Sequence, residues 1–436
     1  MNLFGNVLVA GTGPAAIQLA ILFKHWCKSH VGIAGRHSVR SAPLFEALRE
    51  SNGQLVVEVS SAKLEALAGE YQVDEFFYGY RNVKGHWDTL LLTVTADAYI
   101  PVLAQLQPEL LDNLRCVVLL SPTFGSNALI RQYLKEQRCN AEVVSFSTYI
   151  GDTRLMADKP PGHVLTTAVK RRVYTGSSTQ ASQFVEAFLN LYAQAGIQLV
   201  DLNSALEAEA HNISLYVHCP LFMNHFSLDA IFNPSDISQY VYKLFPEGPI
   251  TPTLIHEMLL QWKEISVLSQ KLNLKEINLL RFMVDDNYPV RPESLSRQEI
   301  DQFTELDSIH QQYLLYVRYA SLLIDPYSEP DQHGKYFDFS AVPIRPVFVN
   351  HDGAWDIPRM PKEDYYRIKI IQGIARGAKV PCPTVDTFIE RYEQYLVKSS
   401  RLLKEYPLSD DFIPKSFEED IRRICMELPL SDQNKV

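Results

Sequence analysis

The sequence predicts an α/β fold, in which an N-terminal Rossmann-type, doubly wound sheet is followed by a mainly α-helical domain. Three observations support this fold class. The apolar run Val7–Ala10 leads into a glycine-rich turn and then into a helical apolar pattern. Strand and helix patterns alternate over the first half of the chain. Beyond about Leu206, long helical patterns replace the strands.

The length of 436 residues exceeds what one hydrophobic core ordinarily organises, so two domains are expected. We place a dinucleotide-binding domain at residues 1–203. Residues 204–436 are assigned to a helical domain that carries substrate binding, catalysis and dimerisation. A symmetric homodimer is expected because this is the commonest oligomer.

The composition, with 46% hydrophobic and 21% charged residues, is that of a globular protein. The net charge of −10 argues against nonspecific nucleic-acid binding, which needs basic patches. No apolar run approaches the roughly 18 residues of a membrane span. The N-terminus lacks the basic start and apolar stretch of a signal peptide, so a cytoplasmic protein is expected.

Six scattered cysteines form no Cys-x-x-Cys pair. In a large cytosolic chain such cysteines are expected to be reduced thiols, and a structural zinc site is not expected.

The elements of the first half follow in order. After Val7–Ala10, a helix is expected from Ala15 to about Lys28, and a buried strand at Val31–Ala34. Runs of Val and Leu without polar alternation suit a parallel sheet covered on both faces. Such runs predict further strands at Leu55–Val59, Leu90–Val94, Cys116–Leu120 and Glu142–Phe146, with a helix at Asn127–Gln137.

After His163 the pattern changes. Val164–Thr167 and Arg172–Gly176 indicate a hairpin-like addition, followed by a helix at Ser182–Ala195 and a last strand at Gln198–Val200. The second half has long helical patterns joined by proline-rich connections. These lie at Pro252–Leu272, Lys275–Met283, Leu306–Leu323, Lys362–Arg376 and Val385–Lys404.

The segment Gly11-Thr12-Gly13-Pro14-Ala15-Ala16 matches the Gly-x-Gly-x-x-Gly/Ala fingerprint, after a strand and at the start of a helix. The first glycine permits a tight turn, the second lets a pyrophosphate approach the backbone, and the last small residue allows close packing. Pro14 suits the first helical turn, where its missing N–H is not needed. The alternative is a tight strand–helix turn of some other α/β protein.

The end of the second strand discriminates between dinucleotides. NAD sites usually carry an acidic residue there, about 20 residues after the fingerprint. This chain has Ala34-Gly35-Arg36, followed by His37, Ser38 and Arg40. Arginine provides planar, bidentate donors suited to a 2′-phosphate, so NADPH is the expected cofactor. The alternative is that these are solvated surface arginines.

Long blocks of the sequence resemble the opine dehydrogenases that make bacterial metallophores, of the staphylopine, pseudopaline and yersinopine type. The resemblance extends over essentially the whole chain. It is carried by Gly11–Pro14, Ser121–Ser126, Phe146–Arg154, Ser214–His218, Tyr242–Pro249, Asn287–Glu293 and Tyr336–Pro343.

The resemblance implies a reaction in which the amine of an amino-acid-derived substrate condenses with a 2-oxo acid, and NADPH reduces the resulting imine. In the metallophore branch the amine belongs to a histidine that carries an aminobutyrate unit, supplied by a partner synthase. The 2-oxo acid is pyruvate or 2-oxoglutarate. The finished product chelates metal through its nitrogen and oxygen donors, so no metal is expected on the enzyme.

The resemblance places the active-site histidine of the family at His218, and histidine is the usual proton shuttle near neutral pH. His211 and His225 are the nearby alternatives. Asp152 is expected in a loop at the carboxyl end of the sheet, where open α/β sheets bind ligands. The resemblance places it near the 2-oxo acid, where a carboxylate would repel the second carboxylate of 2-oxoglutarate and favour pyruvate. Without the resemblance, Asp152 reads equally well as a turn or cap residue.

Several other residues are candidates. Arg154 is expected to meet the cofactor or a substrate carboxylate, with an ordinary ion pair as the alternative. Ser121-Pro122-Thr123 and Thr95-Ala96-Asp97 follow strands and are expected to line the cofactor. Four residues of the helical domain are either structural or bind substrate carboxylates, and the sequence leaves both roles open. They are Tyr242, Lys243, Arg291 and Tyr336.

One position departs from the family pattern. Some relatives carry a lysine six residues beyond the arginine after the second strand, where this chain has Ala42. Arg40 or His37 would then supply the second phosphate contact. Two other functions stay open from the sequence: an NADP-dependent hydroxy-acid or ketopantoate-type reductase of the same plan, and a non-catalytic NADP(H)-binding sensor.

Overall fold

The computed structural model describes residues 2–233, 237–322, 333–334, 338 and 340–430. The chain forms two compact units. The first comprises Met1–Asn212 together with Arg422–Leu428, and the second comprises Ile213–Ile421 and Pro429–Val436. The expected boundary after Asn203 precedes helix α7, and the division between the units follows that helix.

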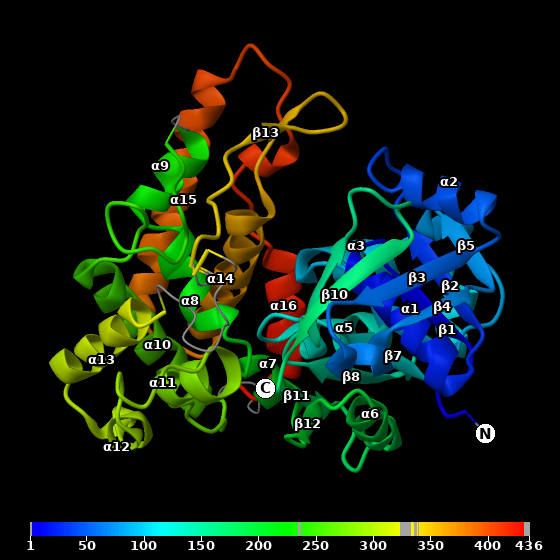
Figure 1. Cartoon of the computed structure of the whole chain (residues 1–436), viewed down its shortest axis with the longest axis horizontal. Coiled ribbons are helices and arrows are strands. Elements are labelled where there is room, and N and C mark those ends of the chain that lie inside the picture. Colours follow the sequence, from blue (N-terminus) through cyan, green and yellow to red (C-terminus); the bar gives the residue numbers. More distant parts are fainter. Residues whose placement is uncertain (1, 234–236, 323–332, 335–337, 339, 431–436) are drawn as a thin grey trace, which may run out of the picture. The chain divides into compact units, whose positions relative to one another are not determined.

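The first unit is built on an eight-stranded sheet with the order β12-β11-β8-β7-β6-β1-β2-β5 (Figure 1). Neighbouring strands are parallel except at β8 and β11, which pair antiparallel. This confirms the predicted fold class of a Rossmann-type sheet followed by helices. The strands are β1 (Val7–Ala10), β2 (Val31–Gly35), β5 (Glu75–Tyr78), β6 (Thr89–Leu92), β7 (Cys116–Leu119), β8 (Glu142–Phe146), β11 (Arg172–Ser177) and β12 (Gln198–Asp201).

Strand β1 is the topological switch point of this sheet. Its two neighbours are β2 on one side and β6 on the other, so the chain leaves β1 in one direction and later returns to continue in the other. Open α/β sheets bind their ligands in the crevice at the carboxyl end of such a strand. In this chain that position is held by the turn that begins at Gly11.

A second, four-stranded sheet has the order β4-β3-β10-β9. Its strands are β3 (Gln54–Val59), β4 (Gly69–Gln72), β9 (Gly151–Leu155) and β10 (His163–Val169). Helix α1 (Pro14–Cys27) contacts β1 and β2 of the main sheet and all four strands of the second sheet. The helix therefore lies between two sheets, which explains why residues on nearly every side of it are buried.

Two strand assignments from the sequence are wrong. Leu55–Val59 forms a strand, but in the second sheet rather than in the doubly wound one. Val164–Thr167 and Arg172–Gly176 do not form a hairpin, because β10 pairs with β3 and β9 while β11 pairs with β8 and β12. A short connection between two apolar runs indicates a hairpin locally, but the partner of each strand is chosen by tertiary packing.

The remaining helices of the first unit are α2 (Ala42–Glu50), α3 (Tyr99–Leu103), α4 (Pro108–Asn113), α5 (Ser126–Glu136), α6 (Gln183–Gln194) and α7 (Ala205–Ala210). Short turns are η1 (Ala62–Leu67), η2 (Tyr80–Asn82) and η3 (Ala96–Ala98). Aromatic rings join α1 and α6 over the sheet. Phe4 packs edge-on against Phe23 with centroids 5.1 Å apart, and Phe146 packs edge-on against Phe188 at 5.0 Å.

A buried carboxylate closes the start of α5. Glu209 of α7 is fully buried, and its oxygens accept hydrogen bonds from the Gly125 N–H at 2.8 Å, the Asn127 N–H at 2.7 Å and the Ser145 hydroxyl at 2.9 Å. These N–H groups are the ones that a helix N-terminus leaves without an internal partner. Glu209 therefore occupies the anion-binding end of α5 with a side chain of the protein itself.

The second unit is helical, apart from the two-residue strands β13 (Phe348–Val349) and β14 (Trp355–Asp356). Helix α8 packs against α10 and α14, and α10 also packs against α13 and α15. Its helices are α8 (Ser214–Phe222), α9 (His225–Phe232), α10 (Pro252–Lys271), α11 (Leu279–Arg281), η4 (Phe282–Asn287), α12 (Arg297–Asp301), η5 (Phe303–Glu305), α13 (Ser308–Ala320), α14 (Arg359–Gly377), α15 (Pro383–Leu402) and η6 (Asp410–Phe412). Helix α16 (Glu418–Glu427) begins in this unit, and its residues from Arg422 onward belong to the first.

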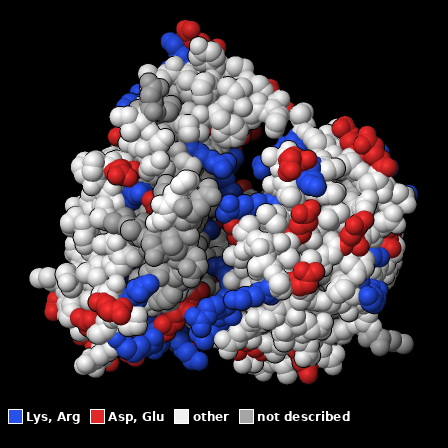
Figure 2. Space-filling view, viewed as in Figure 1, with Lys and Arg blue, Asp and Glu red and all other residues white. Residues whose placement is uncertain are grey.

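Over the described residues, none of the helices is both long enough and apolar enough to cross a membrane. Figure 2 shows acidic and basic side chains together on the visible face, with large uncharged areas between them. The net charge of −10 thus does not exclude local cations that would suit an anionic ligand.

Burial raises the pKa of Glu209 to about 8, from 4.5, against the effect of its hydrogen-bond donors. The folded protein therefore holds this proton more tightly than the unfolded chain, and the associated stability is lost as the pH rises through about 8. We expect the Tm of the wild type minus the Tm of Glu209→Gln to fall by about 5 °C or more between about pH 6 and about pH 9. Differential scanning calorimetry of both proteins measures it, and a constant difference would contradict the prediction.

Candidate active site

The glycine turn after β1 has two different steric environments. Gly11 has φ +145°, and a Cβ there would lie 2.1 Å from the Thr93 hydroxyl oxygen. Its N–H donates to the Ala34 carbonyl at 2.8 Å, which ties the turn to β2. Gly13 is different, because a Cβ there would meet nothing within 4 Å. Glycine at position 11 is thus required by the fold, whereas Gly13 borders open space.

The N-terminus of α1 is open to a ligand. Its cap residue Gly13 has no side chain to accept from the first N–H groups, and the first turn contains no acidic residue. Pro14 stands at the start of the helix, Ala15 is partly buried and Ala16 is fully buried against the sheet. The N–H groups and the positive end of the helix dipole therefore face the switch point without an internal anion. The α5 N-terminus, closed by Glu209, is the contrast.

The segment after β2 is held from two sides. The Ser41 hydroxyl donates to the Arg36 carbonyl, and the Tyr78 hydroxyl donates to the Ser38 carbonyl at 3.0 Å. The Arg36 and Arg40 side chains are exposed. The backbone is thus fixed while these two guanidinium groups stay available to a phosphate.

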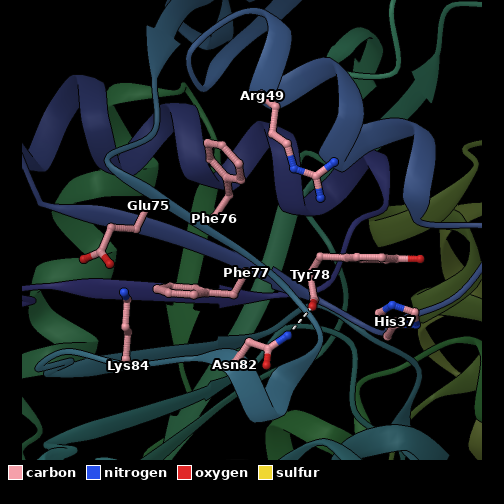
Figure 3. A pocket seen from close by; sticks show the side chains of 8 residues that line it. All are labelled: His37, Arg49, Glu75, Phe76, Phe77, Tyr78, Asn82 and Lys84. Atoms are coloured by element: carbon pink, nitrogen blue, oxygen red, sulfur yellow. Dashed lines mark hydrogen bonds between the residues drawn. The ribbon is translucent and has the colours of Figure 1, made fainter.

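An open pocket of about 590 Å³ lies beside this segment (Figure 3). His37 lines it and stacks on Tyr78 with ring centroids 4.2 Å apart. Figure 3 shows Arg49 of α2 on one side of the pocket and Lys84 with Glu75 on another. Arg49 and Tyr78 were not among the residues predicted from the sequence. Their position next to the residues after β2 emerges only when β5 pairs with β2.

The loop after β7 contains Ser121, Pro122 and Thr123. The Thr123 N–H donates to the Ser126 hydroxyl at 3.0 Å, and the Pro122 carbonyl accepts from the Asn212 amide at 3.2 Å. The Thr123 hydroxyl is buried and has no hydrogen-bond partner among the described residues. A buried hydroxyl without a partner at the carboxyl end of a central strand is a candidate contact for a polar ligand group.

Asp152 lies in strand β9 of the second sheet, not in a loop after the main sheet as the sequence predicted. Its carboxylate accepts from Arg154 Nε at 3.1 Å and from the Thr167 hydroxyl at 3.0 Å. Partial burial opposes its charge, but these hydrogen bonds hold the pKa of Asp152 below its ordinary value. Asp152 and Arg154 therefore form one partly exposed ion pair. An ordinary ion pair was the alternative role expected for Arg154.

His218 lies on α8, and its ring is held at both nitrogens. Nδ1 is 3.1 Å from Asp364 Oδ1, and Nε2 is 3.3 Å from the Ser214 hydroxyl oxygen. The imidazole retains 17% exposure, whereas the Asp364 side chain has none. Asp364 thus orients the ring through Nδ1, while Nε2, beside the Ser214 hydroxyl, is the nitrogen suited to proton transfer. This is the arrangement of a general acid–base pair.

Asp364 is part of a buried ionic network on α14. Arg367, which is 4% exposed, binds Asp364 Oδ1 and also Glu363 Oε1 at 3.2 Å. Arg359 binds the other oxygen of Glu363. A buried carboxylate needs such partners to stay charged. Asp364 and Arg367 were not predicted from the sequence, because their only local signal is a three-residue spacing on a helix, which is common.

The alternative histidines lack this environment. His211, in the first unit, packs on the Tyr174 ring at 4.4 Å and its Nδ1 lies 2.7 Å from the Glu207 carbonyl oxygen. His225 begins α9, where Nδ1 is 3.5 Å from the Tyr395 hydroxyl. These contacts are made to a backbone carbonyl and to a tyrosine hydroxyl, whereas His218 contacts the buried carboxylate of Asp364.

The other candidate residues of the helical domain differ in their contacts and exposure. The Lys243 ammonium binds Asp338 at 2.6 Å and Glu247 at 3.5 Å, so it is engaged in ion pairs. Arg291 is exposed. Tyr336 lies outside the described residues. Over the part of the chain that the structure describes, no group of three or more His, Cys, Asp or Glu side chains is arranged to hold a metal ion.

A Rossmann-type unit with an open glycine turn, followed by a helical unit with a histidine–carboxylate pair, is the plan of a two-domain dehydrogenase. Comparison with known proteins narrows this class. The family model described as staphylopine dehydrogenase matches residues 5–428. The chain is 44% identical over 417 residues to staphylopine synthase of Staphylococcus aureus, which covers 95% of this chain and 96% of the relative. It is 38% identical over 389 residues to pseudopaline synthase of Pseudomonas aeruginosa, with 89% of each covered.

Among solved structures, yersinopine dehydrogenase with NADP+ bound superposes with a TM-score of 0.90 at 30% identity, covering 98% of this chain and 99% of that one. The protein belongs to the staphylopine dehydrogenase family. Its class is thereby that of the opine dehydrogenases, which are oxidoreductases. The family resemblance expected from the sequence is confirmed.

Substitution of the two glycines of the turn by alanine is expected to change stability to different extents. Gly11→Ala places a Cβ against Thr93 at a positive φ, so we expect a loss of about 1–3 kcal/mol in the free energy of unfolding. Gly13→Ala has φ −81° and free space, so its change is expected to stay within about 0.5 kcal/mol. Urea denaturation measures both, and equal losses would contradict the steric difference.

Proposed function

We propose that the protein is an NADPH-dependent opine dehydrogenase that reductively condenses a 2-oxo acid with the amine of a histidine–aminobutyrate intermediate supplied by a partner synthase. The observation that carries the chemistry is His218, whose Nδ1 contacts the buried Asp364 while its ring stays partly exposed. The names of the staphylopine and pseudopaline synthases support the product class.

NADPH is the proposed electron donor. The NADP+ in the yersinopine dehydrogenase structure supports it. The residues present fit such a group, because Gly13 borders free space and the α1 N-terminus has no internal anion. Gly11–Ala16 would hold the pyrophosphate, and Arg36 with Arg40 or His37 the 2′-phosphate. Ser121, Pro122 and Thr123 would line the nicotinamide half. When bound, the cofactor supplies a hydride.

The proposed reaction balances as follows. The amine nitrogen bonds to the carbonyl carbon of the 2-oxo acid, and loss of water gives an imine. The imine carbon then accepts a hydride and the nitrogen a proton, which gives a secondary amine. The overall reaction consumes one 2-oxo acid, one amine, one NADPH and one proton, and releases water and NADP+.

His218 would carry the protons of this sequence. The neutral imidazole accepts a proton from the amine as the C–N bond forms, and the imidazolium returns a proton to the leaving hydroxyl. The contact of Asp364 with Nδ1 fixes the orientation of the ring, so that Nε2 is directed away from Asp364. Arg367 binds Asp364 Oδ1 and Glu363 Oε1, which holds the Asp364 side chain in place.

Pyruvate is the proposed 2-oxo acid, with 2-oxoglutarate as the alternative. The lowered pKa of Asp152 keeps it ionised near neutral pH, where it would repel a second carboxylate. Arg154 binds the same carboxylate and offsets part of that repulsion. We therefore expect a preference of no more than about tenfold for pyruvate. Equal turnover of the two acids at equal concentration would reject the pyruvate preference.

The function is tested by following NADPH oxidation with pyruvate or 2-oxoglutarate in the presence and absence of the amine made by the synthase. Mass spectrometry of the products identifies the opine. Oxidation that requires both substrates supports the proposal. Oxidation with the 2-oxo acid alone would favour a hydroxy-acid or ketopantoate-type reductase, and tight NADPH binding without turnover would favour a sensor.

Arg36 is expected to set the preference for NADPH over NADH. Its side chain is exposed at the end of β2, and the lost bidentate contact to a 2′-phosphate is worth about 1.5–3 kcal/mol. Arg36→Ala should raise the KM for NADPH by about tenfold to a hundredfold and leave the KM for NADH nearly unchanged. Arg131→Ala, at a half-exposed arginine of α5 that binds Glu427, is the control. Unchanged selectivity would remove Arg36 from the site.

Asp364→Asn is expected to reduce kcat by about 10²–10⁴, since the amide no longer holds the ring in the required tautomer. The KM for NADPH should stay nearly unchanged, because the expected defect lies in proton transfer. Asp301→Asn, in an exposed ion pair with Arg297, serves as the control. An unchanged kcat, or an equal loss of kcat in Asp301→Asn, would contradict this role for Asp364.

A further inference from the structure

Arg318 is a buried arginine whose charge is not balanced within the described part of the chain. It lies near the end of α13 and is only 5% exposed. No described residue forms an ion pair or hydrogen bond with its guanidinium, and Nε is buried without a partner. Arginine carries five N–H donors, and burying them without acceptors is unfavourable. The fold therefore does not supply the hydrogen-bond acceptors that this buried side chain needs.

The neighbours of Arg318 are tyrosines. Its guanidinium lies over the Tyr319 ring at 5.0 Å from the centroid. Tyr242 and Tyr288 are its other electrostatic neighbours, and burial lowers the pKa of Arg318. Stacking on a ring face satisfies the face of the guanidinium but not its edge, where the N–H groups point. The edge is suited to a planar anion.

Tyr242 links this cluster to the histidine–aspartate pair. Desolvation raises the pKa of Tyr242, and its electrostatic neighbours include both Asp364 and Arg318. Tyr242 thus interacts electrostatically with both Arg318 and Asp364, and Asp364 is the residue that contacts His218. All of these side chains come from α13, α14 and the segments around residues 242 and 288.

The other buried or half-buried arginines of this unit have acceptors. Arg367 binds Asp364 and Glu363. Arg391 also stacks on a ring, that of Phe388 at 5.5 Å, but it binds Glu257 at 2.8 Å and donates to the Met223 carbonyl at 3.1 Å. In Arg391, ring stacking accompanies a carboxylate partner. Arg318 stacks on a ring in the same way but has no carboxylate partner among the described residues.

We propose that Arg318, with Tyr242, Tyr288 and Tyr319 around it, binds a substrate carboxylate and orients that substrate for His218. The proposal rests on the proposed function, in which both the amine and the 2-oxo acid carry carboxylates. A guanidinium edge binds a carboxylate through two parallel N–H···O bonds, which fixes direction as well as position. Arg318 is thereby a specificity-determining residue for one of the two substrates.

The test compares Arg318→Met and Arg318→Lys with the matched control Arg391→Met, in NADPH-loaded full-length protein. We expect Arg318→Met to raise the KM for one substrate on the order of a hundredfold, and to leave the KM for the other and for NADPH nearly unchanged. The substrate affected identifies whose carboxylate binds. Arg318→Lys should recover part of the loss, because it restores the charge but not the two-pronged contact.

A second arm separates binding from folding. Wild type should discriminate between the amine substrate and its analogue without the α-carboxylate, or between pyruvate and pyruvamide, and Arg318→Met should lose that discrimination for one pair. Arg391→Met is expected to lower the Tm without changing either KM. If Arg318→Met retains the full discrimination for both pairs, or lowers only the Tm as Arg391→Met does, Arg318 is structural and the inference is overturned.

Failure of the proposed function is recognised independently. If wild type turns over no amine with any 2-oxo acid, calorimetric titration of pyruvate and of L-histidine into NADPH-loaded wild type and Arg318→Met decides the inference alone. Binding of either acid that weakens in Arg318→Met but not in Arg391→Met supports a carboxylate site. Binding of neither acid to wild type would overturn it.

Discussion

A buried carboxylate must find donors inside the protein, and this requirement organises both units. In the helical unit Asp364 is completely buried and binds His218 and Arg367 together. Because these residues come from α8 and α14, the ionic contact fixes how the two helices pack. In the first unit Glu209 plays the corresponding part, since it joins α7 to the N-terminus of α5 and to β8. Loss of either carboxylate would leave buried donors without an acceptor.

The two carboxylates also determine where the protein offers sites to other molecules. The α5 N-terminus is filled by Glu209, so it is not a place for a phosphate. The α1 N-terminus has no such side chain and opens at the switch point of the sheet. Asp364 binds both His218 and Arg367 through Oδ1, while Arg318 has no carboxylate partner among the described residues. Polar groups with partners inside the protein stabilise the fold, whereas the α1 N-terminus and Arg318 are available to ligands.

Local sequence patterns predicted elements well where the local signal and the tertiary environment agree. The strand β1, the glycine turn and the helix α1 follow directly from the apolar runs and the fingerprint, and the long helices α10 and α15 follow from their periodicity. The pairing partner of each strand was harder to predict. Leu55–Val59 reads as a buried strand in either sheet, and β10 and β11 look like a hairpin until their pairing is known. Asp152 was placed in a loop because β9 has no apolar alternation, and its strand exists through pairing with β10.

The sequence by itself determined the fold class, the position of the dinucleotide fingerprint and, through long blocks of resemblance, the family. These depend on residue type at fixed spacing along the chain. The tertiary structure decided which charges meet. Asp364 lies 146 residues from His218, and Arg318 reaches Tyr242 and Tyr288 only when α13 is packed. Such contacts carry no local signal, because they depend on the distance between side chains in space and on how completely water is excluded around them.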